Sequence, residues 1–146
     1  MRKIFFPLLS ITTISYTLPG CELPNAAMES VLFNKLSDDL KIDTSAINET
    51  KAKVEILDIT TISRFYAEKL AKIDYENDKV RNNNKPLLDE KSYFHSFYDN
   101  GVKSITAKYT YTNSVGKKDV FIATSLMNKD ECSVRFNGYI TLSREF

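Results

Sequence analysis

The sequence predicts an α+β fold, in which one amphipathic helix near the amino terminus packs on a curved antiparallel sheet of about five strands. An apolar stripe between Ala26 and Leu40 recurs at three- and four-residue spacing, which is typical of a helix with one buried face. From Ser104 onward, apolar and polar residues alternate with a period of two, as in antiparallel strands. Polar turn segments separate these runs, and a chain of 146 residues is long enough for one core.

The predicted helix covers Ala26 to Leu40, and Asn25 is a suitable residue for its amino-terminal cap. Its apolar stripe consists of Met28, Val31, Leu32, Leu36 and Leu40. A polar loop is expected from Asp43 to Thr50. Residues 53–62 are rich in valine, isoleucine and threonine, and they predict the first strand.

Residues 65–76 fit two different structures. As a helix, the segment would be capped by Ser63, and Glu68 and Lys72 would pair four residues apart. As a strand, its second half alternates between apolar and polar side chains. The alternation, and the polar loop that follows at 77–86, favour a strand, so a strand is the prediction.

The second half of the chain predicts an antiparallel meander. Residues 91–98 predict a strand, and Asp99-Asn100-Gly101 predicts the turn that follows it. The next strand, 104–112, has one face made of Ile105, Ala107, Tyr109 and Tyr111. Alternation returns in the following strand at Val120, Ile122, Thr124 and Leu126. Gly138 in the last strand predicts a β-bulge or a close approach of another backbone. One face of this strand is made of Cys132, Val134, Phe136, Ile140 and Leu142. One helix followed by such a meander resembles the cystatin-like plan, in element order alone.

The first 21 residues have the layout of an export signal. Arg2 and Lys3 precede an apolar run that ends in Leu18-Pro19-Gly20-Cys21. The run is shorter than the about 20 residues needed to span a bilayer. The four-residue motif resembles the lipobox of bacterial lipoproteins, although Pro19 replaces the usual small residue. That resemblance implies removal of residues 1–20 and a lipid on Cys21, which would anchor the domain 21–146 to the bacterial cell envelope, at the outer membrane.

Two other interpretations of this segment stay open. The chain could be secreted without lipid, with Cys21 and Cys132 forming a disulfide. Alternatively, the apolar run could be retained as a membrane anchor.

The sequence offers little for catalysis or cofactor binding. His95 is the single histidine, which argues against a metal site built from histidine and cysteine. In a strand, Ser96 and His95 would point to opposite faces and could not act together. The carboxylate pairs Asp38/Asp39, Asp89/Glu90 and Asp130/Glu131 are all expected in solvent. Four scattered glycines cannot form a phosphate-binding loop, and after removal of residues 1–20 the chain lacks a basic excess for nucleic acid. We therefore expect no catalytic residue, metal, cofactor or nucleic-acid partner.

The segment 93–98 is the strongest candidate for a binding surface. Both faces of the predicted strand would carry aromatic side chains, whereas a sheet covered on one side buries only one face. The candidate partner-binding residues are Tyr93, Phe94, Phe97 and Tyr98, with the nearby loop 82–85. The expected function is binding of a protein partner, in an inhibitory or assembly-assisting role. The alternative is a small hydrolase or ligand carrier with a cavity between helix and sheet.

Overall fold

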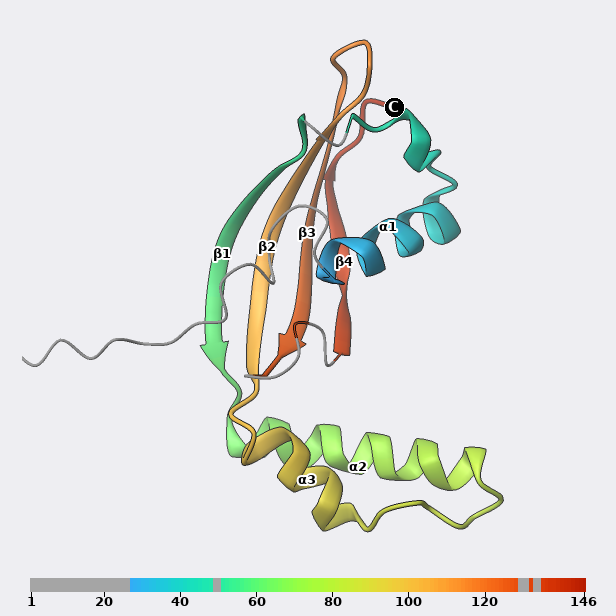
Figure 1. The fold of residues 1–146 in the computed structure, drawn as a ribbon, viewed down its shortest axis with the longest axis vertical. Coiled ribbons are helices and arrows are strands. Elements are labelled where there is room, and N and C mark those ends of the chain that lie inside the picture. The colour runs from blue at the N-terminus through green and yellow to red at the C-terminus, as the bar shows by residue number, and fades with distance from the viewer. Residues whose placement is uncertain (1–26, 49–50, 129–131, 133–134) are drawn as a thin grey trace, which may run out of the picture.

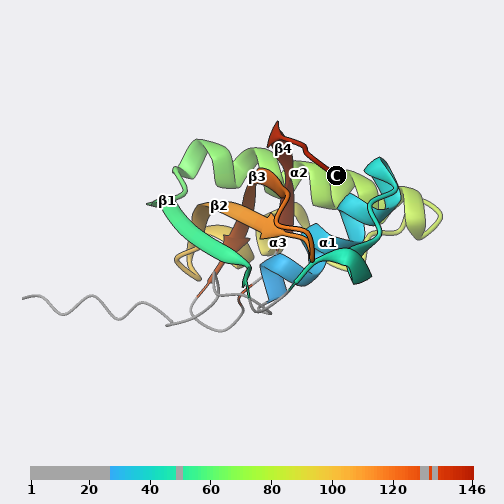
Figure 2. The same ribbon diagram turned by 90° about the horizontal axis from the view of Figure 1, so that it is seen from above.

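A computed structural model describes residues 27–48, 51–128, 132 and 135–146, and it has an α+β architecture (Figure 1). The elements in chain order are α1 (Ala27–Leu40), the 3₁₀ helix η1 (Thr44–Ala46), β1 (Lys53–Thr61), α2 (Arg64–Arg81), α3 (Glu90–Tyr98), β2 (Lys103–Thr112), β3 (Lys118–Met127) and β4 (Arg135–Ser143). The strands form one antiparallel sheet in the order β1-β2-β3-β4. Helix α1 lies on one face of the sheet, and α2 and α3 form a helical hairpin at one end (Figures 1 and 2).

Helix α1 lies within the predicted helix, whereas the predicted cap Asn25 and the export segment fall outside the described residues. Met28, Leu32 and Leu36 from the predicted stripe are fully buried, and Val31 and Leu40 are half-buried. These side chains pack with Tyr109, Tyr111 and Phe121 from the sheet to form the main core. Burial of each such aliphatic side chain stabilises the fold by about 1.5–3 kcal/mol.

The prediction of a strand over residues 65–76 is wrong, because the segment forms α2. Ser63 caps this helix by accepting a hydrogen bond from the Tyr66 backbone N–H at 3.2 Å. The Arg64 guanidinium pairs with Glu68 four residues later, at 2.9 Å. Ala67, Leu70 and Ala71 are buried together, which is a helical spacing. The short alternation in the sequence is therefore coincidental. The Ser63 cap of the helical alternative is present, and Glu68 pairs with Arg64 in place of the expected Lys72.

The prediction of a strand over residues 91–98 is also wrong, because this segment forms α3. Asp89 caps the helix by accepting from the Ser92 backbone N–H at 2.7 Å. Aromatic residues are enriched in strands, but that preference depends on the surface they pack against. Here the packing surface is the small-residue face of α2 at Ala67 and Ala71. The sheet consequently has four strands among the described residues, in place of the predicted five.

The two central strands set which side chains face α1. The predicted face of β2, made of Ile105, Ala107, Tyr109 and Tyr111, is fully buried and confirmed. In β3 the alternation is correct, but the face that meets the core is the other one. Tyr109 pairs with Phe121 and Ala107 with Ala123, so that the inward residues are Asp119, Phe121, Ala123 and Ser125. Val120, Ile122 and Thr124 are half-buried on the outer face of the sheet.

A bulge is present at Gly138, and it changes which side chains of β4 face the core after this residue. Thr124 pairs with Gly138 while Ser125 pairs with Phe136, so one extra residue is inserted. Gly138 has a φ of 129°, a conformation that glycine adopts without a side-chain clash. Phe136 and Tyr139 then both pack on the main core. Ile140 is 58% exposed and Leu142 is also exposed, so the prediction that both share the face of Phe136 is wrong.

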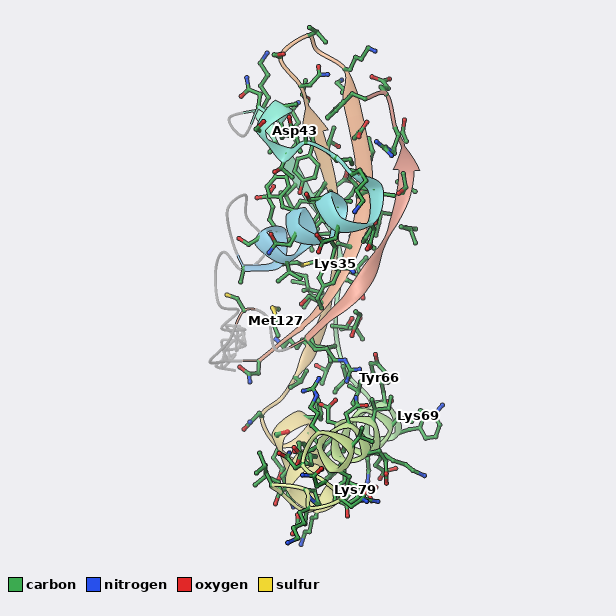
Figure 3. The ribbon with its side chains drawn as sticks, turned by 90° about the vertical axis from the view of Figure 1, so that its right-hand side faces the viewer. Lys35, Asp43, Tyr66, Lys69, Lys79 and Met127 are labelled. Carbon is green, nitrogen blue, oxygen red and sulfur yellow. The ribbon has the colours of Figure 1, made fainter. Side chains whose placement is uncertain are left out.

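A second core fixes the helical hairpin to the end of the sheet. It contains Ile62, Ala67, Leu70, Ala71, Phe97, Val102 and Leu126. Arg135 at the start of β4 donates to Asp74 of α2 at 2.9 Å, which adds an ion pair to this junction. Figure 3 shows the result from the side, with the hairpin extending beyond the sheet. No helix in the described part of the chain is both long and apolar enough to cross a bilayer.

Candidate functional site

The helical form of α3 divides the four predicted binding residues into two pairs. Tyr93 and Phe97 are four residues apart, as are Phe94 and Tyr98, so each pair shares a helix face. Phe97 is buried in the second core, so it supports the helix packing from below and presents little surface to a partner. Tyr93 and Phe94 are half-buried against this core, and Tyr98 is 44% exposed.

The exposed part of the site is an aromatic–arginine surface made of Arg64, Phe94 and Tyr98. The rings of Phe94 and Tyr98 stack with centroids 5.2 Å apart and an interplanar angle of 18°. The Arg64 guanidinium lies 5.5 Å from the centroid of the Phe94 ring, within the range of a cation–π interaction. Aromatic and arginine side chains are the residues most enriched at protein–protein hot spots. This surface can stack on an apolar or planar side chain, and Arg64 can bind a carboxylate.

A hollow adjoins this surface at the α2–α3 interface. Its volume is about 270 Å³, and it is lined by Glu68, Ala71, Glu90, Lys91 and Phe94. The walls combine one aromatic ring with charges of both signs, so the hollow suits a single amphipathic side chain from a partner.

The side chains considered for catalysis interact with other groups of the protein. His95 is exposed and its Nδ1 pairs with the Asp99 carboxylate. The Ser96 hydroxyl donates to the carbonyl of Tyr93 at 2.7 Å, inside its own helix. Asp39 pairs with Lys35 at 3.2 Å, whereas Asp130 and Glu131 lie outside the described residues. The residues that the structure describes contain no group of three or more histidine, cysteine, aspartate or glutamate side chains that could hold a metal.

The loop 82–85 is not brought together with the exposed aromatic pair. It lies at the free end of the α2–α3 hairpin, whereas Tyr98 lies at the other end of α3, next to β2 (Figure 1). The structure thus separates the predicted surface into two parts, one near the sheet and one at the tip of the hairpin.

A buried polar cluster beneath α1 was missed in the sequence. Glu29 on α1 is fully buried, as are Tyr109 and Tyr111 on β2. Phe33 covers the Tyr111 ring at a centroid distance of 4.9 Å. Glu29 follows Met28 and precedes Leu32 by three residues, so a helical projection would have placed this carboxylate within the apolar stripe.

Asp119 on β3 is a second buried carboxylate that no sequence pattern indicated. It accepts hydrogen bonds from the backbone N–H groups of Glu145 at 2.7 Å and Phe146 at 3.2 Å. Arg144 lies 3.6 Å from its other oxygen. Three successive residues after β4 are thereby tied to β3, and Phe146 packs against the main core. This carboxylate is structural, because its oxygens face the chain's own backbone and cation.

Of the two cysteines, the structure describes Cys132. Cys21, the predicted lipid attachment site, lies outside the described residues. Cys132 packs against the main core and is disulfide-bonded. The sequence contains one other cysteine, Cys21. A cysteine sulfur in a disulfide cannot also carry a thioether-linked lipid, so these two states of Cys21 exclude one another.

The chain matches no protein-family model, no curated protein and no solved structure. The functional argument therefore depends on the geometry of this chain's own residues.

We expect Tyr111 to ionise only when the protein unfolds. Burial, together with the nearby charge of Glu29, raises the pKa of Tyr111 well above that of an exposed tyrosine. The neutral phenol therefore contributes stability that is fully present below about pH 10, the pKa of an unfolded tyrosine. This contribution is lost as the pH rises toward the raised folded-state pKa, by about 1.4 kcal/mol per pH unit.

Urea unfolding between neutral and strongly alkaline pH measures this loss, with tyrosinate absorbance as the readout of ionisation. Tyr111→Phe should flatten the alkaline decline, and Tyr98→Phe, at an exposed site, should leave it unchanged. Ionisation of Tyr111 near its ordinary pKa in the folded protein would contradict the expected burial.

Proposed function

We propose that this chain is an exported, non-enzymatic protein of the bacterial cell envelope, which acts by binding a protein partner. The observation that carries the proposal is the aromatic–arginine surface of Arg64, Phe94 and Tyr98. The partly exposed rings beside a guanidinium offer a partner an apolar face and a cation in one place, and tyrosine and arginine are enriched at protein–protein hot spots. Both inhibition of a partner and assistance in its assembly require only such binding.

The position of the surface supports the proposal. Arg64 begins α2 and Phe94 and Tyr98 belong to α3, and both helices are fixed by the second core beneath them. Their side chains are thereby held in place before a partner arrives, which lowers the entropic cost of binding. An extended peptide segment with one aromatic or aliphatic side chain and one carboxylate would match the surface, the hollow and Arg64.

The alternative of a hydrolase or ligand carrier has less support. Such a protein needs a cavity between helix and sheet, but the side chains of Met28, Leu32 and Leu36 fill that interface at full burial. His95 lies on α3, away from the main core. We also propose that the element order follows the cystatin-like plan, with α2 and α3 inserted between β1 and β2.

Tyr98→Ala and Arg64→Ala are expected to weaken capture of the partner by about tenfold or more, since truncating a hot-spot residue costs at least about 2 kcal/mol. Neither change should shift the melting temperature by more than a few degrees, because both side chains are exposed. Phe97→Ala should instead destabilise the protein, by about 3–5 kcal/mol.

The measurement is a quantitative pull-down from envelope extracts with each tagged variant as bait. Val115→Ala is the matched control, because Val115 is an exposed apolar residue in the β2–β3 turn at the opposite end of the molecule. A partner retained equally by Tyr98→Ala and Val115→Ala would contradict the proposed surface.

Two proposals for Cys21 follow from two different observations. The disulfide at Cys132 favours a secreted protein without lipid, in which the bond ties the amino-terminal segment to the main core. The motif Leu18-Pro19-Gly20-Cys21 favours a lipoprotein at the outer membrane, in which Cys21 carries the lipid. Export is common to both, because disulfides persist in oxidising compartments.

Thiol counting combined with fatty-acid labelling separates the two proposals. In the disulfide-bonded form, the denatured and unreduced protein has no reactive thiol and takes up no fatty acid. In the lipoprotein form, the chain takes up fatty acid, and the label disappears in Cys21→Ser. Two reactive thiols in exported protein without label would contradict both.

A further inference from the structure

The free end of the α2–α3 hairpin carries a cluster of exposed apolar side chains. We call residues 79–88 the hairpin tip; they comprise the last turn of α2 and the loop that leads to α3. Val80 is 79% exposed and Leu87 is 77% exposed, and Leu88 beside them is also exposed. Only one described apolar side chain elsewhere, Val115, reaches a similar exposure, at 76%. The tip therefore combines several water-facing aliphatic groups in one short segment.

The charge of the tip has a single sign. Residues 79–88 include Lys79, Arg81 and Lys85, and they contain no aspartate or glutamate. Lys79 pairs with Glu76 at 3.2 Å. Arg81 and Lys85 are exposed, and neither forms an ion pair with another residue in the described ranges. Lys85 is available to an anion, and the exposed Arg81 also lines a polar hollow with Asp74, Asp78 and Tyr93.

Two carboxylates flank the tip in sequence, Asp78 before it and Asp89 after it, and Glu90 follows as an exposed side chain. Asp78 accepts hydrogen bonds from the Asn82 side-chain amide and from the Leu87 backbone N–H. Asp89 accepts from the Ser92 backbone N–H at 2.7 Å. These hydrogen bonds compensate part of the charge of both carboxylates, and the exposed cations within the tip are Arg81 and Lys85.

The backbone of the tip is fixed by its own hydrogen bonds. Asn83 and Asn84 adopt left-handed conformations, with φ of 53° and 64°, which asparagine tolerates better than most residues. The Asn84 N–H donates to the Lys79 carbonyl at 2.8 Å, and the Lys85 N–H donates to the Asn82 carbonyl at 3.0 Å. This loop geometry holds Leu87 and Leu88 outward, away from the second core.

We propose that the hairpin tip binds the surface of a bilayer that contains anionic lipids. Val80, Leu87 and Leu88 would enter the boundary between headgroups and acyl chains, and Arg81 and Lys85 would contact lipid phosphates. A bilayer fits the tip because three exposed aliphatic side chains and two exposed cations lie within ten residues at the free end of the hairpin. Each cation near an anionic membrane surface strengthens binding by about fivefold.

This inference is independent of the aromatic–arginine surface and of any lipid on Cys21. The tip lies at the free end of the hairpin, and Tyr98 lies at the end of α3 next to β2 (Figure 1). A tip held at a bilayer would leave Tyr98 nearer the sheet and open to a partner.

The full chain contains no tryptophan, so a single introduced tryptophan reports on one site. Leu87→Trp places the probe in the tip, and Val115→Trp places it at the opposite end, at nearly equal exposure. Each variant is mixed with vesicles of phosphatidylcholine alone or of phosphatidylcholine and phosphatidylglycerol in equal amounts. Emission wavelength and quenching by brominated phosphatidylcholine are recorded, and circular dichroism checks that each variant is folded.

The expected result is a blue shift and quenching of the Leu87→Trp signal with anionic vesicles, and no change for Val115→Trp. Adding Arg81→Gln and Lys85→Gln to the Leu87→Trp variant should weaken vesicle binding by about 25-fold, the product of two cation contributions. Because the probe reports on the tip itself, attachment of the chain through its amino-terminal segment alone would not give this pattern.

Three results would overturn the proposal. Unchanged Leu87→Trp emission with anionic vesicles would show that the tip stays in water. Equal shifts with both vesicle types would show that the cations take no part. A shift that appears without vesicles and grows with protein concentration would show that a second copy of the chain covers the tip.

Discussion

Burial of one sheet face beneath α1 is the constraint on which the rest of the structure depends. Tyr109 and Phe121 on neighbouring strands, with Leu32 above them, exclude water from this face. Side chains alternate along each strand, so the pairing of β2 with β3 determines every other inward residue at once. Phe146 packs against the same core, and its backbone N–H donates a hydrogen bond to Asp119. The end of the described chain therefore also depends on this face.

The α2–α3 hairpin packs through a core of its own at one end of the sheet. It meets the sheet through a small core that includes Ile62, Val102 and Leu126, and its helices then extend beyond the strands (Figure 3). Stability of the sheet is thus largely independent of the residues that the hairpin exposes. That separation allows apolar side chains such as Tyr98 and Leu87 to stay exposed on the hairpin without a cost to the main core.

Sequence patterns predicted the elements that have one dominant signal. The apolar stripe of α1, the alternation of β2 and the irregularity at Gly138 could all be predicted from the sequence. The faces of β3 were not, because the inward set includes Asp119 and Ser125 while the outer set includes Val120 and Ile122, so only pairing with β2 distinguishes them. The bulge was predicted, but not its consequence that Tyr139 packs against the core while Ile140 is exposed. In 91–98 the aromatic residues suggested a strand, although packing against Ala67 and Ala71 makes a helix. Tyr98 and Phe97 were both predicted to bind a partner. In the helix, Tyr98 is exposed and Phe97 lies in the second core.

The stability of Phe121→Ala compared with Ile140→Ala tests the assignment of the two sheet faces most directly. Urea unfolding of both variants, followed by far-ultraviolet circular dichroism, gives the two free energies of unfolding. Phe121 is fully buried beneath α1, so its truncation is expected to cost about 3–5 kcal/mol. Ile140 lies on the outer face, and its truncation is expected to cost less than about 1 kcal/mol. Equal losses, or a larger loss for Ile140→Ala, would contradict the assignment.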